Sequence, residues 1–106
     1  MLDGKFTRGT TPTHVFYLPV HVSNFIDLTV TYRQCGREVI KKRNEDCHVE
    51  ENIISVTLTQ EESLSFLPDK IAKAQLKVLT DGGEVLASPE YRLGVEDILD
   101  DEEFSI

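Results

Sequence analysis

The sequence predicts an all-β fold, an antiparallel β-sandwich of about seven short strands with one short helical turn. Segments such as FIDLTVTYRQ (residues 25–34) alternate apolar and polar side chains, which is the pattern of a half-buried strand. Turn residues separate these segments at spacings of about 8 to 12 residues, as is typical of sandwiches. One stretch, LTQEESLSF (residues 58–66), has instead the pattern of a capped helical turn. A length of 106 residues fits one domain.

The first two strands are expected over residues 14–20 and 25–34. Residues 14–20 alternate and include β-branched and aromatic side chains. Pro12 and Pro19 bracket this segment, and because proline cannot donate to a ladder they indicate strand ends or a sheet edge. Residues 25–34 form the clearest strand. Its apolar side chains are expected on one face, and they are Ile26, Leu28, Val30 and Tyr32.

Two tight hairpins are expected. Residues 34–37 form a turn in which Gly36 can adopt positive φ, and residues 37–43 return as the partner strand. A second strand pair closes at Asp81-Gly82-Gly83, because an Asp-Gly pair is one of the strongest short-range hairpin signals. The alternating segment before it begins at Ile71.

The segments between and after the hairpins are also extended. Residues 47–50 are short, and residues 53–59 alternate apolar and polar side chains. After the second hairpin, Pro89 interrupts the returning segment before residues 91–95. A proline at this point indicates a bulge, a sheet edge or a crossing between sheets.

The helical turn carries its own capping signal. Thr59 is followed three residues later by Glu62, which is a capping-box pattern, and Pro68 ends the turn early. We interpret the turn as a corner where the chain crosses from one sheet to the other. Its apolar side chains are expected to plug the open end of the core, and they are Leu64, Phe66 and Leu67.

The negative charge gathers in the last eleven residues. The formal charge is −8, and residues 96–106 contain six acids and no base, which leaves 13 acids and 11 bases elsewhere. A nearly neutral body lacks the basic surface that sequence-independent nucleic-acid binding requires, so no nucleic-acid partner is expected. The basic cluster at residues 41–43 is followed by Glu45 and Asp46, and we interpret it as a solvated hairpin.

These patterns divide the chain into three parts. Residues 1–10 are expected to form a flexible N-terminal arm, residues 11–95 the β-sandwich domain, and residues 96–106 an acidic C-terminal tail. No apolar run approaches the roughly 18 residues of a membrane span, so no membrane partner is expected. The N-terminal residues do not resemble a secretory signal peptide, which predicts an intracellular product.

The two cysteines, Cys35 and Cys47, are compatible with a disulfide, but an intracellular protein favours two free thiols. Together with His48 they could supply three zinc ligands. No C-x-x-C pair or fourth ligand at a usual spacing accompanies them, so no metal site is predicted.

No catalytic or cofactor-binding residues are predicted. The sequence contains no G-x-S-x-G elbow, and Cys47 and His48 are sequence neighbours whose side chains point to opposite faces of a strand. Gly82 and Gly83 lie in a hairpin rather than in a phosphate-binding loop between a strand and a helix. The sequence therefore predicts a protein that is not an enzyme and has no cofactor.

The acidic tail combines carboxylates with apolar residues. Its carboxylates lack the glycine and the alternating order of a calcium loop, which leaves a solvated tail or a peptide that docks on a neighbouring subunit. The spacing of the apolar residues is compatible with packing on a neighbouring subunit, which keeps docking open as the alternative to a solvated tail. The candidate interaction residues are Ile98, Leu99, Phe104 and Ile106.

The order of the segments carries a resemblance. It runs from RGTTPTHVFYL through FIDLTVTYRQCGREVIKK, CHVEENIISVTLTQEESLSF and KAQLKVLTDGGEVLAS to YRLGV, over about residues 8–95. This order resembles small phage and prophage proteins of Gram-positive bacteria and, more distantly, the amino-terminal immunoglobulin-like domain of phage baseplate upper proteins. In that family a T-x-E-[ED]-[ST] turn follows the strand before the crossover, as Thr59, Glu61, Glu62 and Ser63 do here. The closing D-G hairpin corresponds to Asp81-Gly82.

The resemblance implies an immunoglobulin-like sandwich that acts as a non-catalytic structural or protein-interaction module. The expected role is a baseplate or other virion accessory component, which assembles as a homo-oligomer with other phage particle proteins in the bacterial host cytoplasm and then in the virion. Two other classes share the fold. One is an extracellular carbohydrate-binding or adhesion module, and the other is a small inhibitor of a host protein.

Overall fold

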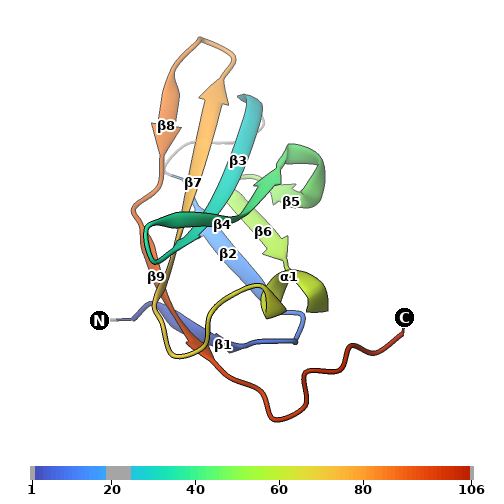
Figure 1. Cartoon of the computed structure of the whole chain (residues 1–106). Helices are drawn as coiled ribbons and strands as arrows, with labels where there is room; N and C mark the ends of the chain where they lie inside the picture. The colour runs from blue at the N-terminus through green and yellow to red at the C-terminus, as the bar shows by residue number, and fades with distance from the viewer. Residues whose placement is uncertain (1, 19–24, 106) are drawn as a thin grey trace.

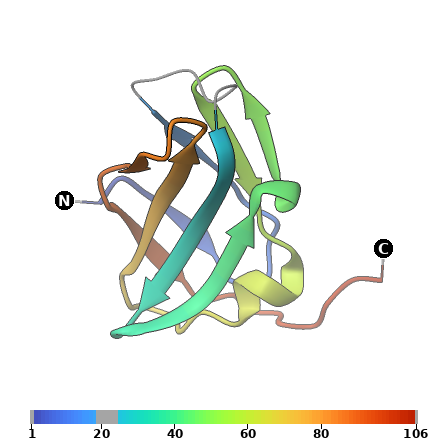
Figure 2. The ribbon, with the colours of Figure 1, turned by 90° about the horizontal axis from the view of Figure 1, so that it is seen from above.

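The structure is a computed structural model that describes residues 2–18 and 25–105, and it confirms the predicted all-β sandwich (Figure 1). The larger sheet has six strands in the order β1-β9-β7-β3-β4, with β8 paired to the remaining length of β7. The smaller sheet has three strands in the order β2-β6-β5. Figure 2 shows the two sheets as separate layers.

The described residues form nine strands and two short helical segments. The strands are β1 (Gly4–Thr7), β2 (Thr13–Tyr17), β3 (Phe25–Gln34), β4 (Arg37–Arg43), β5 (Cys47–Glu50), β6 (Ile53–Thr57), β7 (Ala72–Thr80), β8 (Val85–Ala87) and β9 (Tyr91–Glu96). The helical segments are the 3₁₀ turn η2 (Asn44–Asp46) and the helix α1 (Gln60–Leu64). Pro19 and Val20, at the end of the first expected strand, lie outside the described residues.

The strand order is that of an immunoglobulin-like sandwich, with one departure. The sheet that contains β9, β7, β3 and β4 corresponds to the G-F-C-C′ sheet, and β2, β6 and β5 correspond to strands B, E and D. In the constant-type arrangement the first strand extends the sheet of strand B. Here β1 instead pairs in parallel with β9 in the other sheet, whereas all other strand pairs are antiparallel.

This pairing corrects the prediction of a flexible arm over residues 1–10. Gly4 pairs with Leu93 and Thr7 with Glu96, so residues 4–7 are part of the larger sheet. The physical reason is that Phe6 is buried in the core, where its ring packs edge-to-face against Phe66 at a centroid distance of 5.1 Å.

Both predicted hairpins are present. Cys35 and Gly36 both have positive φ, at 54° and 78°, which defines the two-residue turn that best fits the twist of β3 and β4. The hairpin of β7 and β8 closes with Gly83 at a φ of 88°. Local turn chemistry therefore determines both connections.

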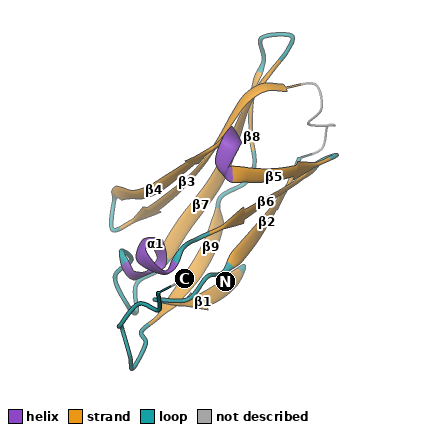
Figure 3. Cartoon of the chain, turned by 90° about the vertical axis from the view of Figure 1, so that its right-hand side faces the viewer, coloured by secondary structure: helices purple, strands orange, loops and turns teal. Residues whose placement is uncertain are grey.

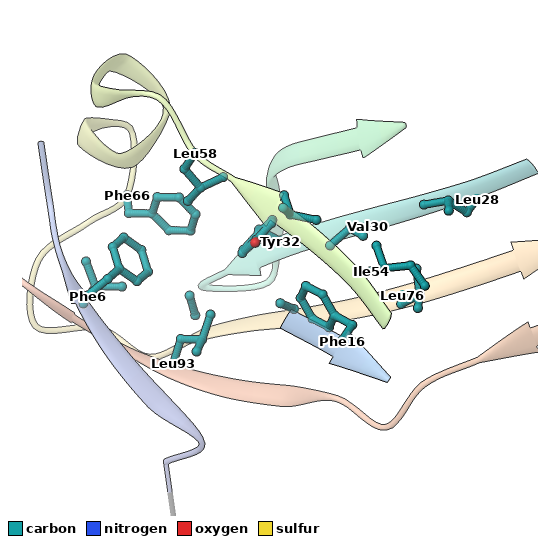
Figure 4. Packing of buried hydrophobic residues seen from close by; sticks show 14 of the residues in the cluster. Phe6, Phe16, Leu28, Val30, Tyr32, Ile54, Leu58, Phe66, Leu76 and Leu93 are labelled. Carbon is teal, nitrogen blue, oxygen red and sulfur yellow. The ribbon is translucent and has the colours of Figure 1, made fainter. Parts of the chain in front are cut away.

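The core lies between the sheets and is richest in aromatic rings toward α1. Tyr32, Phe66 and Phe6 pack against one another there, as Figure 4 shows. Leu28, Val30 and Tyr32 face the core as predicted, but Ile26 is 61% exposed. The prediction for Ile26 was wrong because a register shift between Phe25 and Asp27 turns it outward.

The helical turn begins with the predicted capping box. Thr59 Oγ1 accepts from the Glu62 N–H at 3.1 Å, and the Thr59 N–H donates to Glu62 Oε1 at 2.9 Å. The chain crosses here from β6 to β7, between the two sheets. Of the three side chains expected to plug the core, Phe66 is buried, Leu64 is half-buried and Leu67 is exposed.

The basic cluster at residues 41–43 is not simply a solvated hairpin. Lys42 is only 8% exposed, and its Nζ lies 2.7 Å from Glu62 Oε1. Lys41 and Arg43 are exposed because strand alternation points them to the opposite face. Burial opposes the ionisation of Glu62, but hydrogen bonds from Lys42 and Thr59 hold the pKa of this carboxyl below its usual value.

Candidate interaction surfaces

Strand β2 forms an open edge of the smaller sheet. The Leu18 N–H donates to Asn52 O, and the Leu58 N–H donates to Pro12 O, each at 3.0 Å. These bonds, together with the β2–β6 register, set the alternation of the ladder, in which residues of even number direct their N–H and C=O groups toward β6. Residues of odd number direct theirs outward.

The outward main-chain groups belong to Thr13, Val15 and Tyr17, and we call this set the β2 edge. No described strand pairs with it, because β1 lies in the other sheet. The side chains of Val15 and Tyr17 are 42% and 56% exposed. The β2 edge thus combines unpaired main-chain groups with exposed apolar surface, which is the composition of a strand-pairing site.

The other described edges are protected against pairing. Five of the seven residues of β4 are charged, β1 and β5 have only four residues each, and β8 has three. Strand β2 has five residues, THVFY, and contains no Asp, Glu, Lys or Arg. Charges and short strands are the usual means by which proteins block edge-to-edge association, and β2 has no charge.

A recess of about 290 Å³ lies beside β2, where the two sheets separate. Residues from β1, β2 and β9 line it, including Phe16, Tyr91 and Leu93. His14 also lines this recess, and its Nδ1 lies 2.7 Å from the Tyr32 hydroxyl oxygen. Its Nε2 is buried and has no hydrogen-bond partner among the described residues. Burial lowers the pKa of His14 below the usual 6.5.

The predicted interaction residues of the tail that the structure describes differ in exposure. Ile98 is half-buried, and its Cδ1 lies near Gly9. Leu99 and Phe104 are exposed, and Ile106 lies outside the described residues. Phe104 is held by its main chain, because its N–H donates to Gln60 Oε1 at 2.9 Å and its carbonyl accepts from Gln60 Nε2 at 3.2 Å. Figure 3 shows that α1 and both ends of the chain lie at the same end of the sandwich.

Arg8 joins that end together, although no local pattern around it predicts this role. Its guanidinium donates to the carbonyls of Phe66 at 2.7 Å and Leu64 at 2.9 Å, and to Asp97 Oδ1 at 2.7 Å. The Ile98 N–H and Arg8 together hold the pKa of Asp97 below its usual value. Arg8 therefore connects the residues after β1, the end of α1 and the start of the tail.

The cysteines lie in different elements, and both thiols are free. Cys35 is in the β3–β4 turn, and Cys47 begins β5. Burial and the nearby Asp46 carboxylate raise the pKa of Cys47 to about 11, so this thiol is a poor nucleophile near neutral pH. Across residues 2–18 and 25–105, no three His, Cys, Asp or Glu side chains gather as metal ligands would.

Both helical segments of the described chain fall short of the length and apolar character needed to cross a membrane. Comparison with known proteins found neither a protein-family model nor a curated protein that matches this chain.

Proposed function

We propose that this chain is a non-catalytic structural module that self-associates by strand pairing, as an accessory component of a phage or prophage particle. The observation that carries the proposal is the β2 edge. It is an uncharged strand with outward main-chain groups at Thr13, Val15 and Tyr17, in a sandwich whose other described edges are charged or short.

An antiparallel pairing of two copies about Val15 uses all of these groups. Val15 would pair with Val15 of the second copy, and Thr13 with Tyr17 on either side. Each of these three pairs would make two main-chain hydrogen bonds, about six in all. The same register brings Tyr17 beside Thr13 of the other copy, which covers part of its exposed ring. Two-fold symmetry makes this contact closed and self-complementary.

The assignment to a phage particle is supported by the resemblance in segment order. The T-x-E-E-S segment begins at Thr59 and forms the capped crossover from β6 to β7, and Asp81-Gly82 forms the closing hairpin. These are the two positions that resemble baseplate upper proteins. Edge pairing between subunits suits a particle component because main-chain bonds need no binding pocket.

The test of self-association is the mass in solution, measured by light scattering after size exclusion over a wide concentration range. We expect the wild-type chain to form a dimer or larger oligomer with increasing concentration. Val15→Lys should weaken this association by about a hundredfold or more, because a lysine on an edge strand blocks pairing. Ile71→Lys is the matched control, since Ile71 is 44% exposed and lies outside β2.

A wild-type chain that stays monomeric at all concentrations would contradict the proposal. Equal effects of the Val15 and Ile71 substitutions would place the contact elsewhere. Mass spectrometry of purified particles from a host that carries the gene tests the particle assignment separately. The chain should be present in fixed ratio to the other particle proteins, and its absence would remove the phage assignment.

A further inference from the structure

The basic side chains of the molecule are concentrated on the outer face of the larger sheet. We call this set the basic face, and it consists of Lys5, Arg33, Lys41, Arg43, Lys73, Lys77 and Arg92. It contains seven of the eleven Lys and Arg residues but only five of the nineteen Asp and Glu. Those five acids are Asp3, opposite Arg92, and Asp27, Glu38, Glu90 and Glu96. A chain with a formal charge of −8 therefore has one positively charged surface.

The strand register brings the bases close to one another. Lys73 of β7 is opposite Arg33 of β3 on one side and opposite Arg92 of β9 on the other. Thr29 of β3 lies between Arg43 of β4 and Lys77 of β7 in the same way. Like charges directly across a ladder destabilise a sheet, so the row of Arg33, Lys73 and Arg92 in particular is expected to bind an anionic partner.

Carboxylates of the same face compensate only part of this charge. Lys5 lies 3.3 Å from Glu96, Lys41 lies 3.7 Å from Glu38, and Lys73 lies 3.9 Å from Glu90. In the described part of the chain, the charged side-chain groups of the remaining four bases form no ion pair, although the main-chain N–H groups of Arg43 and Arg92 donate to Asp46 and Asp3. These four bases are Arg33, Arg43, Lys77 and Arg92.

Four carboxylates of the tail also have no ion-pair partner in the described part of the chain, but they carry the opposite charge. Asp100, Asp101, Glu102 and Glu103 are exposed, and none forms an ion pair with a described base. The contacts of Asp97 with Arg8 and of Phe104 with Gln60 hold the tail at the α1 end. Figures 1 and 2 show that it runs past α1 and away from β3 and β7, so it does not cover the basic face of its own chain.

We infer that the acidic tail of one copy, residues 99–103, binds the basic face of a second copy. This inference rests on the proposed self-association, but it uses a different surface from the β2 edge. Four consecutive carboxylates match four uncompensated bases. The contact is heterologous, because tail and face are different patches, so it extends beyond the closed pair formed at the β2 edge.

An apolar pocket beside the bases supplies a place for Leu99. The pocket has a volume of about 160 Å³ and lies next to Lys77, with Leu79 and Val85 in its lining. Val85 is itself exposed. Leu99 is fully exposed in the tail and directly precedes the four carboxylates. In the proposed contact, Leu99 would enter the apolar pocket, and the four carboxylates that follow it would lie near the bases beside that pocket.

A nucleic acid is the other polyanion that could bind a basic face, and the chain fits it less well. The molecule as a whole is acidic, which opposes approach of a long polyanion. The pocket lining also includes the Asp27 carboxylate, which repels phosphates, together with the apolar Leu79 and Val85, beside Thr29 and Lys77. The tail, by contrast, contains both acids and an exposed leucine.

The test exchanges charges between the two surfaces in the full-length chain. The face variant is Arg33→Glu with Lys77→Glu, and the tail variant is Asp100→Lys with Glu102→Lys. Each variant alone should self-associate about tenfold more weakly than wild type at low salt. An equimolar mixture of the two should recover the association, because each acidic surface then meets a basic one. The control, Arg37→Glu with Lys70→Glu, changes exposed bases outside the basic face and should leave association unchanged.

The outcomes separate this contact from the β2 edge. Tail docking should weaken as salt rises, whereas the effect of Val15→Lys should persist at high salt. If Val15→Lys has no effect but the mixed variants recover association, the tail contact stands and the edge contact fails. If neither charge variant changes the association, or the mixture recovers nothing, the inference is overturned. A second result would also overturn the inference. In it, a DNA duplex binds the wild type but not the face variant, and the tail variant self-associates as strongly as the wild type.

Discussion

The α1 end of the sandwich and the β2 edge differ in how completely their polar groups are paired. At the α1 end, Gln34 donates to the carbonyls of Leu67 and Lys70 and accepts from the Leu67 N–H, so its whole amide is used. The Arg8 guanidinium likewise donates three hydrogen bonds. At the β2 edge, the outward main-chain groups of Thr13, Val15 and Tyr17 have no described strand beside them.

The difference separates structural from interaction surfaces. Buried polar groups are normally bonded, so complete pairing at the α1 end indicates that this end is finished within one chain. The open main-chain groups at the edge are the site of the strand pairing that we propose. Substitutions at the α1 end should therefore change stability and leave association alone, and the reverse should hold at the edge.

The largest expected effect on stability is that of Phe66→Ala. Phe66 is buried and packs edge-to-face against Phe6 and Tyr32, so its removal leaves a cavity where β1, β3 and α1 meet. We expect a loss of about 3–5 kcal/mol in the free energy of unfolding, measured by chemical denaturation. Phe104→Ala is the control, because that ring is 80% exposed and should matter little. Equal losses would contradict the described packing.

Gln34→Leu should have the next largest effect. The substitution removes the Gln34 amide, which accepts from the Leu67 N–H and donates to the carbonyls of Leu67 and Lys70. Three main-chain bonds at the α1 end are lost, and we expect a cost of about 3 kcal/mol in the same assay. Gln75→Leu loses a single bond on the exposed face and should cost about 1 kcal/mol or less. A larger cost for Gln75 would reverse the comparison.

Thr59→Ala tests the capping box alone. It removes the acceptor for the Glu62 N–H, and an N-cap loss of this type costs about 1 kcal/mol. Thr59→Ser keeps the hydroxyl and should retain most of the stability. If the serine variant were as unstable as the alanine variant, the threonine methyl group rather than the cap would be responsible.

The smallest effect on stability is a pH dependence at His14, whose side chain lines the recess beside β2. His14 has a lowered pKa in the folded state, so between that value and 6.5 the unfolded chain binds more protons than the folded one. Stability should therefore fall as the pH drops below about 6.5, by roughly a few tenths of a kcal/mol between pH 7 and pH 6, since the ring is partly exposed. His14→Gln should flatten this slope, and the exposed His48→Gln should not. An unchanged slope in His14→Gln would assign it to other groups.

The features that the sequence predicts well are those set by local chemistry. The Cys35-Gly36 turn, the Asp81-Gly82 hairpin and the Thr59 cap depend on residues within a few positions of one another. Strand alternation placed Leu28, Val30 and Tyr32 in the core for the same reason. The exposure of Ile26 escaped prediction because a register shift depends on the neighbouring strand, which sequence alternation does not reveal.

The candidate surfaces were harder to predict because they combine distant segments. Strand β1 has one buried side chain, Phe6, and its partner is at the other end of the domain, so its pattern resembled a polar arm. The basic face is distributed over several strands at alternate positions, and each base is unremarkable in its own segment. The role of Arg8 had no local signal, because its three partners are 56 to 89 residues away in the sequence.

The parallel pairing of β1 with β9 also affects when the molecule becomes complete. Arg8 and Asp97 are 89 residues apart, yet they close the same end of the sandwich. During synthesis, β1 emerges first and has no strand partner until β9 has left the ribosome. Contacts of such long sequence separation form slowly. The finished α1 end and the anchored tail consequently appear together, late in folding.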